Sequence, residues 1–137
     1  MTLNRPKCLN AINLDMMHLL PNVFKDSVDD PNTKVTVITG EGSYYSSGND
    51  LNNFSTIGFT VEEAGSLLSR FVQAFLDFPK PLVAAVNGPA IGIACTTLAL
   101  CDAVYCTEEA TFDTPFMKIG QSPEGCSSYL FPKIMGR

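Results

Sequence analysis

The longest stretch without a charged side chain covers residues 82–101, which is long enough for a membrane-spanning helix. It is interrupted at residues 87–89 by Asn-Gly-Pro, a strong turn signal. We therefore expect a buried strand over residues 82–86, a turn, and a buried helix over residues 90–100. The stretch then belongs to a folded core, and the sequence predicts no membrane span.

The remaining elements alternate between helical and strand-like patterns. Asn13 is placed to cap a helix whose apolar residues recur at helical spacing, with Pro21 inside it. Thr60 and Glu63 form a capping box at the start of a second helix that ends before Pro79. We also expect strands over residues 35–39 and 102–106, and a last helix with Pro123 in its first turn and Glu124 inside it. Strands separated by helices predict parallel pairing and an α/β fold.

Composition and charge exclude some classes of binding partner for this chain. The chain has 137 residues, a net charge of -5 and nine Lys plus Arg, none of them clustered, which argues against nucleic acid or an anionic membrane surface. Its five cysteines have neither disulfide-framework nor metal-site spacing and favour a reducing compartment. The length fits one domain, residues 1–137, and we expect it to be incomplete because both ends interrupt a structural element.

Three glycine-bearing turns, at residues 40–43, 47–50 and 87–89, follow strand-like runs, where α/β proteins usually bind ligands. None is a nucleotide-binding fingerprint. His18 is the only histidine and has neither a serine elbow nor metal-ligand neighbours, so we expect an ordinary helix residue. Glu124 is either a helix-terminus carboxylate or a general base in an apolar pocket.

Several separate segments carry a resemblance to a known family: residues 46–51 (SSGNDL), 79–92 (PKPLVAAVNGPAIG), 101–102 (CD) and Phe112. In order and spacing, they resemble the crotonase (enoyl-CoA hydratase/isomerase) superfamily. Residues 48–51, 114–116 and 120–127 are most similar to the peroxisomal type of Δ3,Δ2-enoyl-CoA isomerase. The resemblance covers nearly the whole chain and implies an α/β crotonase (ClpP/crotonase-like) fold of repeated ββα units, with the C-terminal part missing.

The resemblance also implies roles for individual residues. Glu124 matches the isomerase-type catalytic glutamate, and the backbone amides of Asn49 and Ile93 match the oxyanion hole. Thr96 and Phe116 occupy the two glutamate positions of family hydratases, which disfavours water addition. Contacts with coenzyme A are implied for the following residues: Lys7, Cys8, Leu9, Gly48, Asp50 and Leu51.

By resemblance, the expected activity moves the double bond of a 3-enoyl-CoA to the 2-trans position during β-oxidation of unsaturated fatty acids. The expected partner is an acyl-CoA thioester, and no metal or redox cofactor is implied because coenzyme A is part of the substrate. A homotrimer or hexamer is expected for the full-length protein, in the peroxisome or alternatively the mitochondrial matrix. Two alternatives remain open: an enoyl-CoA hydratase, and a catalytically silent module that binds CoA or a protein, as in chromodomain relatives.

Overall fold

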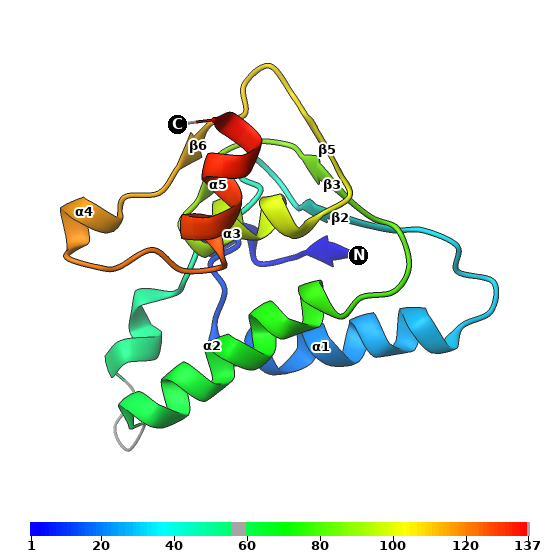
Figure 1. The fold of residues 1–137 in the computed structure, drawn as a ribbon, viewed down its shortest axis with the longest axis horizontal. Coiled ribbons are helices and arrows are strands. Elements are labelled where there is room, and N and C mark those ends of the chain that lie inside the picture. The colour runs from blue at the N-terminus through cyan, green and yellow to red at the C-terminus, as the bar shows by residue number, and fades with distance from the viewer. Residues whose placement is uncertain (56–59, 137) are drawn as a thin grey trace.

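A four-stranded parallel sheet forms the centre of the computed structural model, which describes residues 1–55 and 60–136 (Figure 1). Its strand order is β1 (Thr2–Leu3), β2 (Thr36–Gly40), β3 (Leu82–Val86) and β5 (Ala103–Cys106). In register, Thr36 lies opposite Leu82 and Val83 opposite Ala103. The parallel pairing predicted from the alternation of strands and helices is confirmed.

A second, two-stranded parallel sheet pairs β4 (Ala90–Ile91) with β6 (Phe112–Asp113). The expectation of a helix from Ala90 to Leu100 is wrong at its start, because Ala90 N–H bonds to the carbonyl of Thr111 at 2.8 Å. The helical part begins only at Ile93, with α3 (Ile93–Thr96) followed by η3 (Thr97–Leu100). The successions β3-β4-α3 and β5-β6-α4 are therefore two ββα units, as the resemblance implied.

Two long helices, α1 (Leu14–Asp29) and α2 (Val61–Leu76), lie side by side along the sheet (Figure 1). Both predicted caps are present: Asn13 accepts from Met16 N–H, and Thr60 and Glu63 form a reciprocal capping box. Pro21 lies inside α1 without ending it. The apolar faces of both helices join the core, where the rings of Phe24 and Phe75 meet edge to face at 5.1 Å.

The last helix differs from its prediction. α5 runs over Ser127–Met135, so Pro123 and Glu124 lie in an irregular segment before it. Gly125 and Cys126 have positive φ angles of 60° and 61°, which a right-handed helix cannot contain. The remaining short helices are η1 (Pro6–Cys8), η2 (Leu51–Ser55) and α4 (Phe116–Ile119).

Asparagine side chains tie together the loops at the carboxyl edge of the central sheet. The amide of Asn87 donates to the carbonyls of Gly42 and Tyr44, at 2.8 and 3.3 Å. The amide of the fully buried Asn10 donates to Glu41 and again to Tyr44, each at 2.8 Å. These bonds fix the loops that follow β1, β2 and β3 at one edge, where the sequence places its candidate ligand-binding turns.

No helix in the described part of the chain has both the length and the apolar character needed to cross a membrane.

Candidate active site

The Glu124 side chain borders a cavity of about 390 Å³ between α1, α2 and the segment that leads into α5. The walls are mostly apolar, and the polar groups converge from two loops. The lining consists of Leu14, Met17, Asn49, Asn53, Ala64, Gly65, Leu67, Leu68, Gly120, Gln121 and Glu124. A carboxylate facing apolar walls with a few convergent polar groups is typical of a small-molecule site.

Burial raises the pKa of Glu124 above the ordinary carboxyl range, since removal from water disfavours the charged form. A side-chain hydrogen bond with Gln121 opposes this effect and lowers the pKa. The backbone of Glu124 is also held, because the N–H and Oγ of Ser127 bond to its carbonyl oxygen at 3.1 and 2.7 Å. Glu124 therefore combines a raised pKa with a fixed backbone, and its role as a general base stays a prediction.

Close packing between Gly125 and α3 sets the place of Glu124 relative to that helix. Gly125 has a φ of +60°, and a Cβ there would collide with the side chain of Thr96 and lie 3.3 Å from Cδ1 of Ile93. Only glycine both adopts this left-handed backbone readily and leaves room for the side chains of Thr96 and Ile93. Glu124 is consequently held next to the first turn of α3, where Ile93 is the first residue.

Asn49 reaches the same cavity from the loop after β2. The N–H of Ile12 bonds to the carbonyl of Gly48 and the N–H of Asp50 to that of Ile12, at 2.8 and 3.0 Å. In this parallel pairing, the N–H of the intervening Asn49 points away from Ile12. Gly48, with a φ of +86°, lets the loop approach the carbonyl of Ile91, close to Ile93.

The structure therefore brings Glu124, the Asn49 loop and the start of α3 to one site. Among the described residues, the backbone N–H groups of Asn49 and Ile93 donate to no carbonyl or side chain. The first N–H groups of a helix have no intrahelical acceptor, which agrees with the place of Ile93 in α3. Two backbone donors without an internal acceptor can stabilise a developing oxyanion, and this role of Asn49 and Ile93 stays a prediction.

The residues expected to contact coenzyme A lie beside this site without lining its cavity. Lys7, Cys8 and Leu9 are exposed on η1 and its C-terminal cap, and the Leu9 carbonyl accepts from the N–H of Ser47 at 2.9 Å. Leu51 is 75% exposed. These positions border the Gly48 loop, and their contacts with coenzyme A stay a prediction.

The Asp50 side chain has a structural role in its own loop. Its Oδ2 pairs with Nη1 of Arg5 at 3.0 Å, and its Oδ1 accepts from the backbone and side chain of Asn52 at 3.1 and 2.9 Å. The hydrogen bond from Arg5 is the main cause of the lowered pKa of Asp50. Both carboxylate oxygens thus serve to hold the loop, and a contact of Asp50 with substrate also stays a prediction.

The two hydratase positions contain no carboxylate. Thr96 is fully buried, and its hydroxyl donates to the carbonyl of Ile93 at 3.2 Å. Phe116 begins α4 and is also buried. Neither side chain exchanges a proton as a glutamate does, so Glu124 is the one carboxylate among the described residues that line this cavity.

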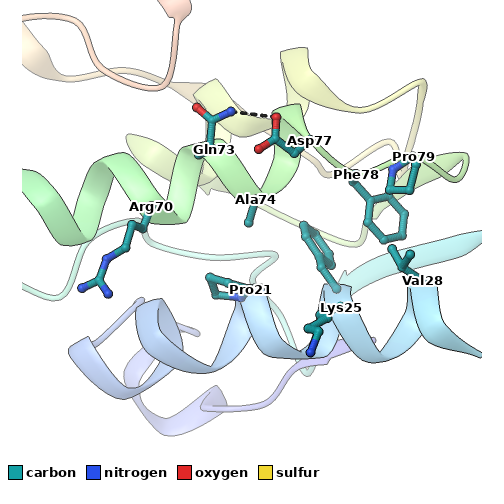
Figure 2. A pocket seen from close by; sticks show the side chains of 10 residues that line it. Pro21, Lys25, Val28, Arg70, Gln73, Ala74, Asp77, Phe78 and Pro79 are labelled. Carbon is teal, nitrogen blue, oxygen red and sulfur yellow. Dashed lines mark hydrogen bonds between the residues drawn. The ribbon is translucent and has the colours of Figure 1, made fainter.

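Other groups do not form a competing centre. No cluster of three or more His, Cys, Asp or Glu suited to a metal ion occurs in residues 1–55 and 60–136. All five cysteines are free thiols, and His18 is exposed on α1. A groove of about 360 Å³ lies between the C-terminal halves of α1 and α2, with Gln73 bonded to Asp77 at its rim (Figure 2). None of the candidate catalytic residues borders it.

Sequence reasoning missed several residues of the site. Gln121, which bonds to Glu124, carries no motif that distinguishes it from a surface glutamine. Ala64, Leu67 and Leu68 recur at helical spacing in α2, which is typical of a core face and does not show that part of this face borders a cavity. Only the docking of α2 against the loop at residues 120–124 reveals that role.

Comparison with known proteins places the chain in a family. The family model of "Enoyl-CoA hydratase/isomerase" matches residues 1–137. The chain is 57% identical to human "Enoyl-CoA delta isomerase 2" over 137 residues, covering 96% of this chain and 34% of the relative. It is 53% identical to mouse "Enoyl-CoA delta isomerase 3, peroxisomal" over 143 residues, covering 98% and 44%.

A solved structure of an enoyl-CoA hydratase/isomerase from Pseudoalteromonas atlantica T6c superposes with a TM-score of 0.90 at 38% identity, covering 99% of this chain and 53% of that one. The chain thus spans between a third and about half of the length of these three proteins. With a family match over its full length and a crotonase-type arrangement of ββα units, the chain belongs to the enoyl-CoA hydratase/isomerase family.

Proposed function

We propose that the natural protein containing this chain is a Δ3,Δ2-enoyl-CoA isomerase. The observation that carries the proposal is Glu124, a single carboxylate with a raised pKa in an apolar cavity that it shares with the Asn49 loop. The similarity to enoyl-CoA delta isomerases 2 and 3 supports the same reaction. Its product would be a 2-trans-enoyl-CoA in the β-oxidation of unsaturated fatty acids.

The proposed chemistry is a proton transfer along the substrate. Glu124 removes a proton from C2 of the 3-enoyl thioester, and the electron pair moves onto the thioester oxygen as an enolate. The N–H groups of Asn49 and Ile93 stabilise that oxygen more strongly than the neutral carbonyl. Glu124 then returns the proton to C4, so the double bond moves from C3 to C2 with no net loss of atoms or electrons.

Proton transfer of this kind requires no metal or redox group, and coenzyme A arrives as part of the substrate. We infer that Lys7 meets a phosphate of coenzyme A and that Leu9 and Leu51 contact its pantetheine arm. This inference is supported by the exposure of the three side chains next to the Gly48 loop. A peroxisomal location is proposed from the mouse relative that is named peroxisomal, and a homotrimer or hexamer from the family resemblance.

Substitution of the base tests the proposal. The experiment uses the longest natural protein that contains this sequence, with the substitution Glu124→Gln. Glutamine has nearly the same side-chain volume as glutamate, and its amide cannot accept the proton. We expect turnover of 3-enoyl-CoA to fall by about 10²–10⁴ while acyl-CoA binding is retained. Formation of the conjugated thioester is followed by absorbance, and Glu109→Gln, an exposed carboxylate outside the cavity, is the matched control.

Three outcomes would contradict the proposal. Turnover by Glu124→Gln within threefold of wild type would remove Glu124 as the base. Rapid loss of the conjugated thioester when 2-enoyl-CoA is supplied would instead reveal a hydratase, which Thr96 and Phe116 disfavour. Binding of acyl-CoA without turnover by wild type would favour the catalytically silent module.

A further inference from the structure

Gly65 occupies an unexpected place for a glycine, inside the long helix α2. Glycine is the least favourable helix-interior residue after proline. The backbone there is ordinary helix, without a positive φ, and a Cβ added at Gly65 would meet no atom within 4 Å. Neither backbone conformation nor packing against a neighbour therefore requires glycine at this position.

Gly65 borders two cavities. The first is the 390 Å³ cavity that holds Asn49 and Glu124. The second, of about 480 Å³, lies further along α2 and does not include Asn49. Four residues line both cavities: Gly65, Leu68, Gln121 and Glu124.

The second cavity continues as an apolar stripe along one side of α2. Leu68, Val72 and Leu76 follow Gly65 at intervals of three and four residues, which places them on one face of the helix. Leu76 is 52% exposed, so the end of the stripe is open to a ligand. An extended alkyl chain matches such a surface because it has no polar group to satisfy.

We propose that the acyl tail of the substrate crosses Gly65 into this second cavity and lies along the stripe of Leu68, Val72 and Leu76. The inference rests on the proposed function, which fixes the thioester oxygen at Asn49 and the carbons from C2 to C4 at Glu124. Carbons beyond C4 then leave Glu124 through the part of the wall shared by the two cavities. Gly65 is a determinant of chain-length specificity because any side chain there narrows this passage.

The test compares Gly65→Leu with wild type in the longest natural chain that carries this sequence. The substrates are 3-hexenoyl-CoA and 3-dodecenoyl-CoA, followed by absorbance of the conjugated thioester. We expect kcat/KM for the long substrate to fall about tenfold more than kcat/KM for the short one, because the leucine fills the passage. Gly65→Ala is expected to give a smaller change of the same kind.

Ser66→Leu is the matched control. It adds the same side chain to the next residue of α2, which is exposed and borders neither cavity, and we expect no change in the ratio of the two kcat/KM values. The melting temperature of Gly65→Leu should not fall below that of wild type, since leucine is the better helix former. A preserved fold separates a blocked passage from a damaged helix.

A binding measurement separates this inference from the proposed reaction. The same variants are titrated with hexanoyl-CoA and dodecanoyl-CoA, which have no double bond to move. Selective weakening of dodecanoyl-CoA binding by Gly65→Leu supports the acyl path. This holds even if the wild-type protein fails to isomerise 3-enoyl-CoA, a result that would overturn only the proposed reaction.

If Gly65→Leu changes the binding of both chain lengths equally, or changes neither, the acyl path is overturned and the role of Glu124 is unaffected. If the wild-type protein binds neither acyl-CoA, the acyl path and the proposed reaction are both overturned.

Discussion

Glu124 experiences two opposing influences at the scale of single residues. Burial raises its pKa, while the hydrogen bond from Gln121 favours the carboxylate and lowers it. Burial makes the carboxylate a stronger base for removing a carbon-bound proton. The carboxylate must still be ionised at the working pH, and the hydrogen bond from Gln121 favours that ionised form.

Gln121→Leu is expected to move the acid limb of the activity profile to higher pH. The variant removes the group that lowers the pKa of Glu124, so the carboxylate takes up its proton at a higher pH and activity is lost earlier on acidification. The measurement is kcat/KM for a 3-enoyl-CoA as a function of pH. A loss of the same size at every pH, without movement of the limb, would indicate a packing role for Gln121 and contradict the expectation.

At the scale of elements, the site depends on how α3 meets the segment before α5. Glu124 belongs to no helix or strand, and its position follows from the contact of Gly125 with Thr96 and Ile93. The bonds from Ser127 join the same segment to the first turn of α5. The helices α3 and α5 thereby fix the backbone at Glu124, although Glu124 lies in neither helix.

Gly125→Ala is expected to destabilise the fold by about 2–4 kcal/mol, as the sum of a left-handed backbone and an overpacked contact with Thr96. Urea unfolding measures the change in the free energy of unfolding. Gly120→Ala is the matched control, because Gly120 has a similar φ of +66° and a Cβ there would meet no atom within 4 Å. Equal losses for the two variants would show that the Thr96 contact contributes nothing.

At the scale of the whole molecule, apolar side chains remain uncovered on α5 and on one face of the central sheet. Tyr129, Ile134 and Met135 are exposed on α5, and Val37 and Tyr105 on the sheet. A parallel sheet is normally covered on both faces. Surface of this kind is a common site of association.

The 137-residue chain alone is therefore expected to self-associate or to be poorly stable. Sedimentation velocity over a range of concentrations should show species heavier than 14.8 kDa. Combining Ile134→Lys with Met135→Lys should shift the distribution towards the monomer, because both side chains are exposed on α5. A compact wild-type monomer that unfolds cooperatively would contradict this prediction.

Local patterns in the sequence were sufficient for much of the fold. The strand at residues 82–86 and the caps at Asn13 and Thr60 were predicted from neighbouring residues and are confirmed. They depend on interactions within a few residues, such as the bond from Met16 N–H to Asn13 or the capping box of Thr60 with Glu63. The family resemblance added Glu124 and the two backbone amides as candidates.

Tertiary structure decided what local pattern cannot encode. Ala90 and Ile91 are a strand because Thr111 and Ser46 supply acceptors from distant segments, which overrides their apolar, helix-like context. The close approach of Gly125 to Thr96 and Ile93 likewise joins segments about thirty residues apart in the chain. The sequence by itself determined which residue types are available for chemistry. The packing of α1 and α2 against the loops that contain Asn49 and Glu124 decided which of them share a cavity, because burial and proximity are properties of the folded chain.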